Sequence, residues 1–196
     1  MGVVVMLSAV AEIVVTILYN KSEPTAIIYN LYYALIFGAL CWYYYEVVFK
    51  YKNRRYFYFG IAVYVISLLL VAFRHSMDIY QGEMWAITGA ILVFFGIVYN
   101  NYQVEKPPLF DKNLYSGLIF NGAVIFYFSF NFFLFMIANY VLTELTPDMS
   151  RMAWAFHNVN NVIKNIAFAF GFYYTMRRRV NLSDEEVEKI QWHRVN

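Results

Sequence analysis

Long apolar stretches separated by short polar connections make up most of this chain. The apolar stretches cover residues 2–19, 27–49, 56–73, 84–99, 117–142 and 153–175. Each is close to the ~20 residues that an α-helix needs to cross the hydrocarbon core of a bilayer. The connections carry Pro24, Gly82, Pro107-Pro108 and Pro147, which favour turns. The pattern predicts an all-α fold, a polytopic integral membrane bundle of six transmembrane helices.

The last apolar stretch differs from the others because it carries polar side chains at membrane depth. These are a histidine, a lysine and four asparagines: His157, Asn158, Asn160, Asn161, Lys164 and Asn165. At about 100° per residue, all of them fall within one arc of about 160° on a helix. An unpaired polar group in hydrocarbon costs several kcal/mol, so this face must meet other helices or water.

Glu12 is a second ionisable residue inside an apolar stretch, at a depth that matches Lys164. Membrane-embedded charges are usually paired and mark functional sites. We expect a Glu12–Lys164 ion pair, which either locks the bundle or belongs to a polar pocket for a ligand or ion, or to a protonation switch. The residues predicted to line that pocket are Glu12, His157, Asn158, Asn161, Lys164 and Asn165.

The distribution of lysine and arginine predicts the orientation. Eleven of the 15 lie in the second and fourth connections and the C-terminal segment, and three lie in the other connections. Basic residues gather on the cytoplasmic side of a membrane. We therefore expect both termini in the cytoplasm, with residues 1–176 as the transmembrane domain and residues 177–196 as a short basic, amphipathic tail.

The tail begins with three arginines, Arg177, Arg178 and Arg179. Such a triplet binds anionic lipid headgroups, and it is also a candidate docking site for a cytoplasmic protein. Further on, Ser183 and Glu186 have capping-box spacing. This spacing predicts a short helix that begins near Ser183 and ends near His193.

The composition agrees with a membrane protein. The chain is 61% hydrophobic and 21% aromatic, and only 14% of its residues are charged, against about 25% in soluble domains. The net charge of +2 does not indicate a nucleic-acid partner. Cys41 is the only cysteine, which excludes an intrachain disulfide and a cysteine metal cluster.

Evidence for enzymatic chemistry is sparse. His75, Asp78 and His157 fall on the predicted outer side and are weak candidates for a metal site. The spacing of His75 and Asp78 is common by chance, and interfacial loop residues explain it better. The sequence contains no HExxH, GxSxG or P-loop signature. We expect no cofactor and favour a non-enzymatic protein.

Three segments carry a resemblance: Asn30-Leu31-Tyr32 through Glu46, Pro108-Leu109-Phe110, and Asn158 through Asn165. In them the chain resembles small aromatic-rich multi-pass membrane proteins of bacteria and the membrane portions of bacterial sensor proteins. The resemblance implies a place in the bacterial cytoplasmic (inner) membrane and a role in sensing. We find no kinase or cyclase domain in the sequence, so a sensor of this kind would signal through a separate protein partner.

These observations favour a receptor-like or regulatory membrane component with a polar intramembrane pocket on the sixth helix. A small oligomeric transporter or channel subunit is the first alternative, in which Lys164 would set the charge preference. A metal-dependent membrane enzyme that uses His75, Asp78 and His157 is the second. A homo-oligomer is compatible with the first two.

Overall fold

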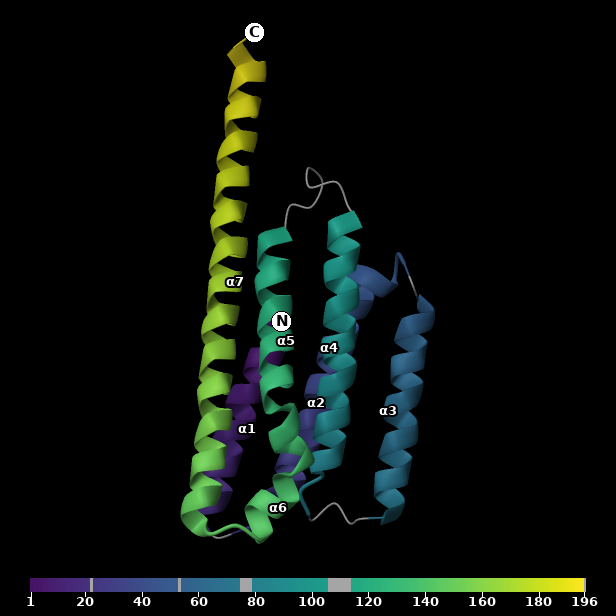
Figure 1. Ribbon diagram of the computed structural model, residues 1–196. Helices are drawn as coiled ribbons and strands as arrows, with labels where there is room; N and C mark the ends of the chain where they lie inside the picture. The colour runs from purple at the N-terminus through teal and green to yellow at the C-terminus, as the bar shows by residue number, and fades with distance from the viewer. Residues whose placement is uncertain (22, 53, 75–78, 106–113, 196) are drawn as a thin grey trace.

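A computed structural model of the protein describes residues 1–21, 23–52, 54–74, 79–105 and 114–195. The regular elements in these ranges are all helical. They are α1 (Gly2–Asn20), α2 (Ala26–Tyr44), the π-helical turn η1 (Tyr45–Phe49), α3 (Arg54–Arg74), α4 (Gly82–Glu105), α5 (Leu114–Met136), α6 (Ala138–Thr143) and α7 (Pro147–Val195). Figure 1 shows the long helices lined up along one axis. The prediction of an all-helical fold is confirmed.

Among the described residues, five helices are long and apolar enough to cross a membrane. They are α1, the continuous α2–η1 segment, α3, α4 and most of α5. Their outer faces carry large exposed apolar side chains, among them Ile13, Leu69 and Phe133. These features support an integral membrane protein in a lipid bilayer. The number of six spans and the position of the termini stay predictions.

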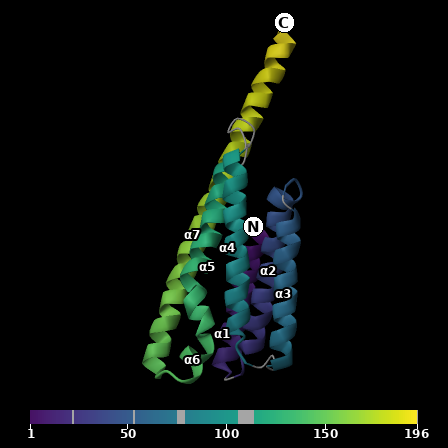
Figure 2. The same cartoon turned by 45° about the vertical axis from the view of Figure 1, so that its right-hand side comes forward.

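Helix α7 is a single element of 49 residues. It begins at Pro147, a residue type favoured at the first helical position because it lacks the N–H that would be unpaired there. The capping-box prediction of a new helix start at Ser183 is wrong, because residues 183–193 continue α7. Extending an existing helix costs less than nucleating one, and no Gly or Pro follows Gly171 to stop it. As a result α7 projects beyond the bundle (Figure 2).

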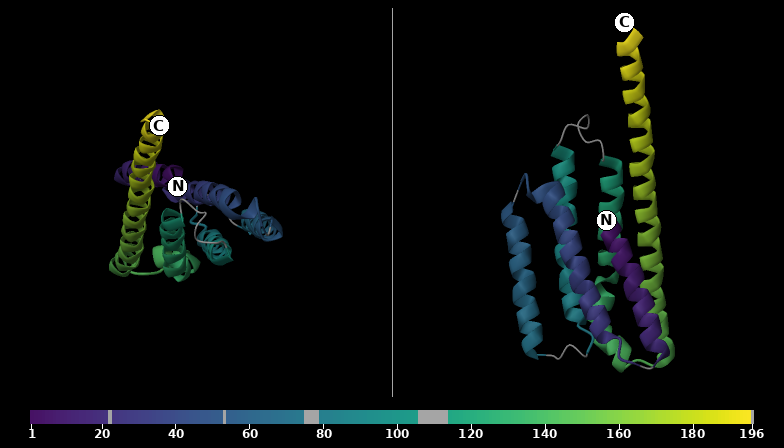
Figure 3. Two further views of the ribbon diagram at one scale, coloured as in Figure 1. Left: turned by 90° about the horizontal axis from the view of Figure 1, so that it is seen from above. Right: turned by 180° about the vertical axis from the view of Figure 1, so that it is seen from behind.

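Helix α5 forms the centre of the packing. It makes its most extensive contacts with α4 on one side and α7 on the other, while α2 and α3 pack against α4 and α1 packs mainly against α2. Seen from above, α7 and α3 lie at opposite sides of the bundle with α5 and α4 between them (Figure 3). Polar residues of α7 can therefore reach α5 more readily than α1.

Aromatic side chains fill much of the core. Tyr33 of α2 stacks on Trp85 of α4 with the ring centroids 4.7 Å apart, and Phe49 of η1 meets Phe95 of α4 edge-on at 4.9 Å. Gly96 allows α4 and α5 to approach closely, since a Cβ there would lie 2.6 Å from Ile125 Cγ1. Such close approach through small residues is a common way to pack membrane helices.

The fifth apolar stretch does not form one helix to residue 142 as predicted. Helix α5 ends at Met136, and the short α6 follows after a turn at Ile137. The turn lets Ala138 and Val141 become buried, at 1% and 2% exposure. Burial of these two apolar side chains against the bundle gives a physical reason for the break.

Candidate functional site

One face of α7 packs on α5. Its most buried residues, Asn160, Lys164, Phe168 and Gly171, recur every three or four positions, which places them on a single side of the helix. Gly171 allows the contact, because a Cβ there would lie 2.7 Å from Phe120 Cε1. Of the polar residues at 157–165, Asn160 and Lys164 therefore lie on the packed face, and the partly buried ones lie at its edges.

The structure separates the predicted pocket residues into two groups. Lys164 is buried, and His157, Asn161 and Asn165 are partly buried beside it. Asn158 and Glu12 are exposed. Two of the six predicted residues therefore lie outside the buried part of the α5–α7 contact, although the Glu12 carboxylate is close enough for its charge to act on Lys164.

Lys164 meets an aromatic ring rather than a carboxylate. Its side chain is 4% exposed, and Nζ lies 4.2 Å from the centroid of the Tyr127 ring of α5. Among the side chains that the structure describes, Lys164 forms no ion pair. The expected Glu12–Lys164 pair is not formed, because α1 packs mainly on α2 and leaves Glu12 on an exposed face. A cation against a ring face gains about 0.5–2 kcal/mol.

His157 is held by a buried asparagine that the sequence analysis did not select. Its Nδ1 lies 3.2 Å from Oδ1 of Asn131, and Asn131 donates from Nδ2 to the Tyr127 carbonyl at 2.8 Å. With the amide oriented this way, Oδ1 accepts and the imidazole must donate from Nδ1. Its position inside a long apolar stretch was the sequence feature that could have identified Asn131.

Three asparagines of α7 each have a buried side-chain atom without a hydrogen-bond partner among the described residues. Asn160 Nδ2, Asn161 Oδ1 and Asn165 Oδ1 are buried and make no hydrogen bond within the described part of the chain. A buried polar group without a partner costs about 1–3 kcal/mol. The polar contact between α5 and α7 is therefore incompletely satisfied in this conformation.

A second polar centre, at Asn121 of α5, is by contrast well satisfied. Its Oδ1 accepts from the Tyr44 hydroxyl at 2.7 Å. Its Nδ2 donates to the Gly96 carbonyl at 3.0 Å and to Asn100 Oδ1 at 2.7 Å. Asn121 is fully buried, so these bonds join α2, α4 and α5 into one unit. The difference from α7 suggests that α7 is the less firmly held helix.

Two cavities lie away from Lys164 and the polar residues around it. One, of about 350 Å³, is mainly apolar and lies between α2, α3 and α4, with Leu31, Leu68 and Met84 in its wall. The other, of about 450 Å³, lies where η1, α4, α5 and α7 converge and includes Glu46, Gln103 and Thr175. Both are in the size range of small-molecule sites.

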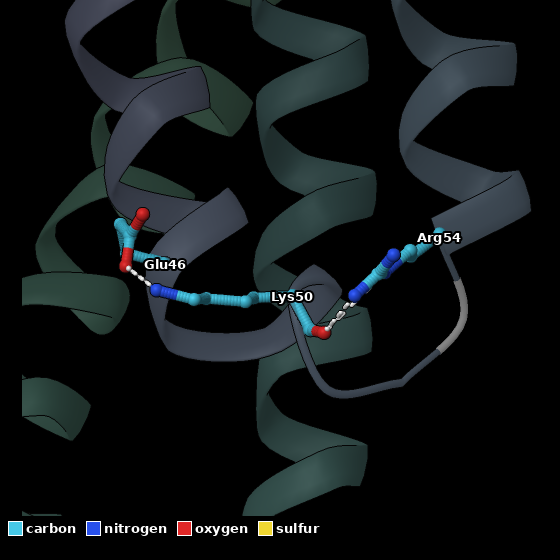
Figure 4. Close-up of polar contacts among 3 residues, drawn as sticks. All are labelled: Glu46, Lys50 and Arg54. Carbon is cyan, nitrogen blue, oxygen red and sulfur yellow. Dashed lines mark hydrogen bonds and ion pairs between the residues drawn. The ribbon is translucent and has the colours of Figure 1, made fainter.

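Glu46, which lines the second cavity, belongs to a chain of polar contacts with Lys50 and Arg54 (Figure 4). Glu46 Oε2 accepts from Lys50 Nζ at 3.0 Å, and Arg54 Nη2 donates to the Lys50 carbonyl at 2.9 Å. The hydrogen bond to Glu46 and the charge of that carboxylate raise the pKa of Lys50. The side chains of Lys50 and Glu46 are 47% and 46% exposed, so water screens the pair and it exchanges readily.

The other candidate residues are not joined into a site by the structure. His75 and Asp78 lie outside the described residues, as do the side chains of Arg177, Arg178 and Arg179, whose backbone belongs to α7. Within the described residues no group of three or more His, Cys, Asp or Glu side chains is arranged to hold a metal. The metal-dependent alternative gains no support from these residues.

Comparison with known proteins does not add a relative. No protein-family model matches the chain, and no curated protein and no solved structure matches it significantly.

Proposed function

We propose that this protein is a non-enzymatic, receptor-like or regulatory membrane component in which α7 carries a signal from the membrane to a cytoplasmic partner. The observation that carries the proposal is the continuity of α7, which runs without interruption from Pro147 to Val195. From Met176 to Val195 it adds about 30 Å of helix. Because such a helix is continuous, a displacement of its membrane end also displaces its far end.

The α5–α7 contact supports a movable α7. It contains a buried ammonium without an ion pair among the described side chains and three asparagine atoms without partners. Such groups gain free energy when they find partners, so a ligand or a shift of α7 that satisfies them would change the packing. During such a shift α2, α4 and α5, which the hydrogen bonds of Asn121 join, would keep their positions relative to one another.

The orientation follows from charge. In this proposal residues 153–175 of α7 are the sixth span, and the basic segment that follows lies in the cytoplasm. Both chain ends then lie on the same side of the membrane, as an even number of spans requires. The projecting end of α7 is thereby accessible to a soluble partner.

A channel or transporter is the less favoured alternative. A pore-lining lysine should face water, whereas Lys164 is 4% exposed and lies against Tyr127. The receptor-like function therefore agrees better with the surroundings of this side chain.

The test of the proposal is partner binding through α7. The full-length protein, crosslinked in native membranes and purified, should retain a specific cytoplasmic protein, and deletion of residues 177–196 should abolish this. Val180→Pro interrupts the helix while it keeps the tail, and Val180→Ala is its matched control. With Val180→Pro, Lys164→Met should no longer alter partner affinity, whereas with Val180→Ala it should.

Two results would contradict the proposal. The first is equal partner recovery from the full-length and truncated proteins. The second is ion or solute flux in proteoliposomes that Lys164→Met abolishes, which would establish the transport alternative.

A further inference from the structure

The 450 Å³ cavity at the convergence of η1, α4, α5 and α7 is a second site, separate from the α5–α7 polar contact. We propose that it binds a primary ammonium group, presented either by a lipid headgroup or by a free amine. The residues that carry this assignment are Tyr43, Glu46, Tyr99, Gln103, Phe120 and Phe172.

The π-helical turn η1 shapes one wall of the cavity. Its wider turn is closed by the bond from the Lys50 N–H to the Tyr45 carbonyl at 2.8 Å. The turn buries Val48 and Phe49 completely in the core, while Glu46 and Val47 line the cavity. Single π turns occur frequently at functional sites because they redirect side chains in this way.

Glu46 supplies the charge. Within the part of the lining that the structure describes, it is the one charged side chain. One carboxylate oxygen accepts from Lys50, and the other receives no hydrogen bond from a described residue (Figure 4). The carboxylate therefore already accepts a primary ammonium and has a second oxygen for another.

Lys50 pairs with Glu46 itself, but two other nearby cations have partners outside the cavity lining. Lys52 pairs with Glu105, and Arg54 donates to the Lys50 carbonyl. Lys50 is therefore the described cation that a ligand at Glu46 would meet.

Gln103 and the aromatic walls complete the chemistry. Gln103 is 9% exposed, and its buried Oε1 has no hydrogen-bond partner among the described residues. Phe120 and Phe172 meet edge-on at 5.0 Å, and the rings of Tyr43 and Tyr99 lie 6.5 Å apart. A carboxylate, an unpaired amide and aromatic rings together suit an ammonium with N–H donors. The Gln103 amide oxygen would gain no hydrogen bond from a trimethylammonium group, because that group has no N–H donor.

The experiment uses the full-length protein in nanodiscs of phosphatidylcholine, whose headgroup has no N–H donor. The thermal midpoint is measured against added ethanolamine, with choline as the matched cation, and again in nanodiscs that contain phosphatidylethanolamine. Retained lipid is identified by native mass spectrometry. We expect stabilisation or retention with the primary ammonium and not with choline.

Variants assign the effect to the cavity. Glu46→Gln should weaken the response by about tenfold or more, because it removes a charged hydrogen-bond acceptor. Glu105→Gln is the matched control, since Glu105 pairs with Lys52 outside the cavity lining, and it should respond like the native protein. Gln103→Leu provides a second cavity variant if Glu46→Gln does not fold, as judged by size exclusion and helical circular dichroism.

The outcomes separate the two sources. A response to ethanolamine in phosphatidylcholine supports a free amine, and a response confined to phosphatidylethanolamine supports the headgroup. The inference is overturned by the absence of both responses, by an equal response to choline, or by a native response in both cavity variants. None of these results depends on the partner proposed for α7.

Discussion

The ammonium of Lys164 in α7 lies 4.2 Å from the centroid of the Tyr127 ring in α5. Both side chains are buried, at 4% and 2% exposure. The attraction is about 0.5–2 kcal/mol, whereas the removal of a charge from water costs several kcal/mol. The contact therefore orients Lys164 without fully offsetting its burial. A residue that costs stability in this way is consistent with a functional role.

Replacement of Lys164 tests this imbalance. Lys164→Met keeps the side-chain length and removes the charge, so it should raise the free energy of unfolding by roughly 1–3 kcal/mol. Tyr127→Leu should lower it, and by less in the Lys164→Met background, with a coupling of about 0.5–2 kcal/mol. Reversible unfolding in mixed micelles measures all four states of this cycle. A large loss of stability in Lys164→Met would contradict the argument.

The hydrogen bond between His157 and Asn131 gives a second prediction. Asn131→Leu removes the bonds to His157 Nδ1 and to the Tyr127 carbonyl. It should lower the free energy of unfolding by about 1–3 kcal/mol, because it leaves the partly buried imidazole without its hydrogen-bond partner. Asn158→Leu makes the same chemical change at an exposed position of α7. Asn158→Leu should change the free energy of unfolding by less than about 0.5 kcal/mol. Equal effects of the two variants would contradict the conclusion that Asn131 is buried and hydrogen-bonded while Asn158 is exposed.

Close contact between α4 and α5 can be tested with glycine variants. At Gly96 a Cβ would lie 2.6 Å from Ile125 Cγ1 and 2.9 Å from Asn121 Oδ1, whereas at Gly122 nothing lies within 4 Å. Gly96→Ala should destabilise the protein by about 1–3 kcal/mol through overpacking. Gly122→Ala should be neutral or stabilising by up to about 1 kcal/mol, since alanine is the better helix former. Thermal unfolding of both variants in one detergent provides the comparison.

The Asn121 centre gives a fourth prediction. Tyr44→Phe removes only the hydroxyl that donates to Asn121 Oδ1 at 2.7 Å. It should cost about 1–2 kcal/mol, because the buried amide oxygen loses a partner. Tyr173→Phe, at an exposed position of α7, is the matched control and should alter stability by less than about 0.5 kcal/mol. A neutral Tyr44→Phe variant would show that water replaces the hydroxyl.

Hydropathy alone located the apolar helices with good accuracy. The predicted stretch 27–49 corresponds to α2 and η1, which together cover Ala26–Phe49, and the predicted stretch 56–73 lies within α3. Such agreement is expected because the transfer of a segment into hydrocarbon depends on the residues of that segment alone. The same local property could not show the turn at Ile137, which depends on what Ala138 and Val141 pack against.

The residue pattern was sufficient to predict a helical protein with segments apolar enough to span a membrane, and a polar surface at residues 157–165 in an apolar setting. The contact of Lys164 with Tyr127, and the hydrogen bond between His157 and Asn131, depend on how the helices pack and could not be predicted from that pattern. The physical reason is that periodicity fixes which residues share a helix face, whereas the partner of that face depends on which helix packs beside it. Here that neighbour is α5, and α1 lies against α2.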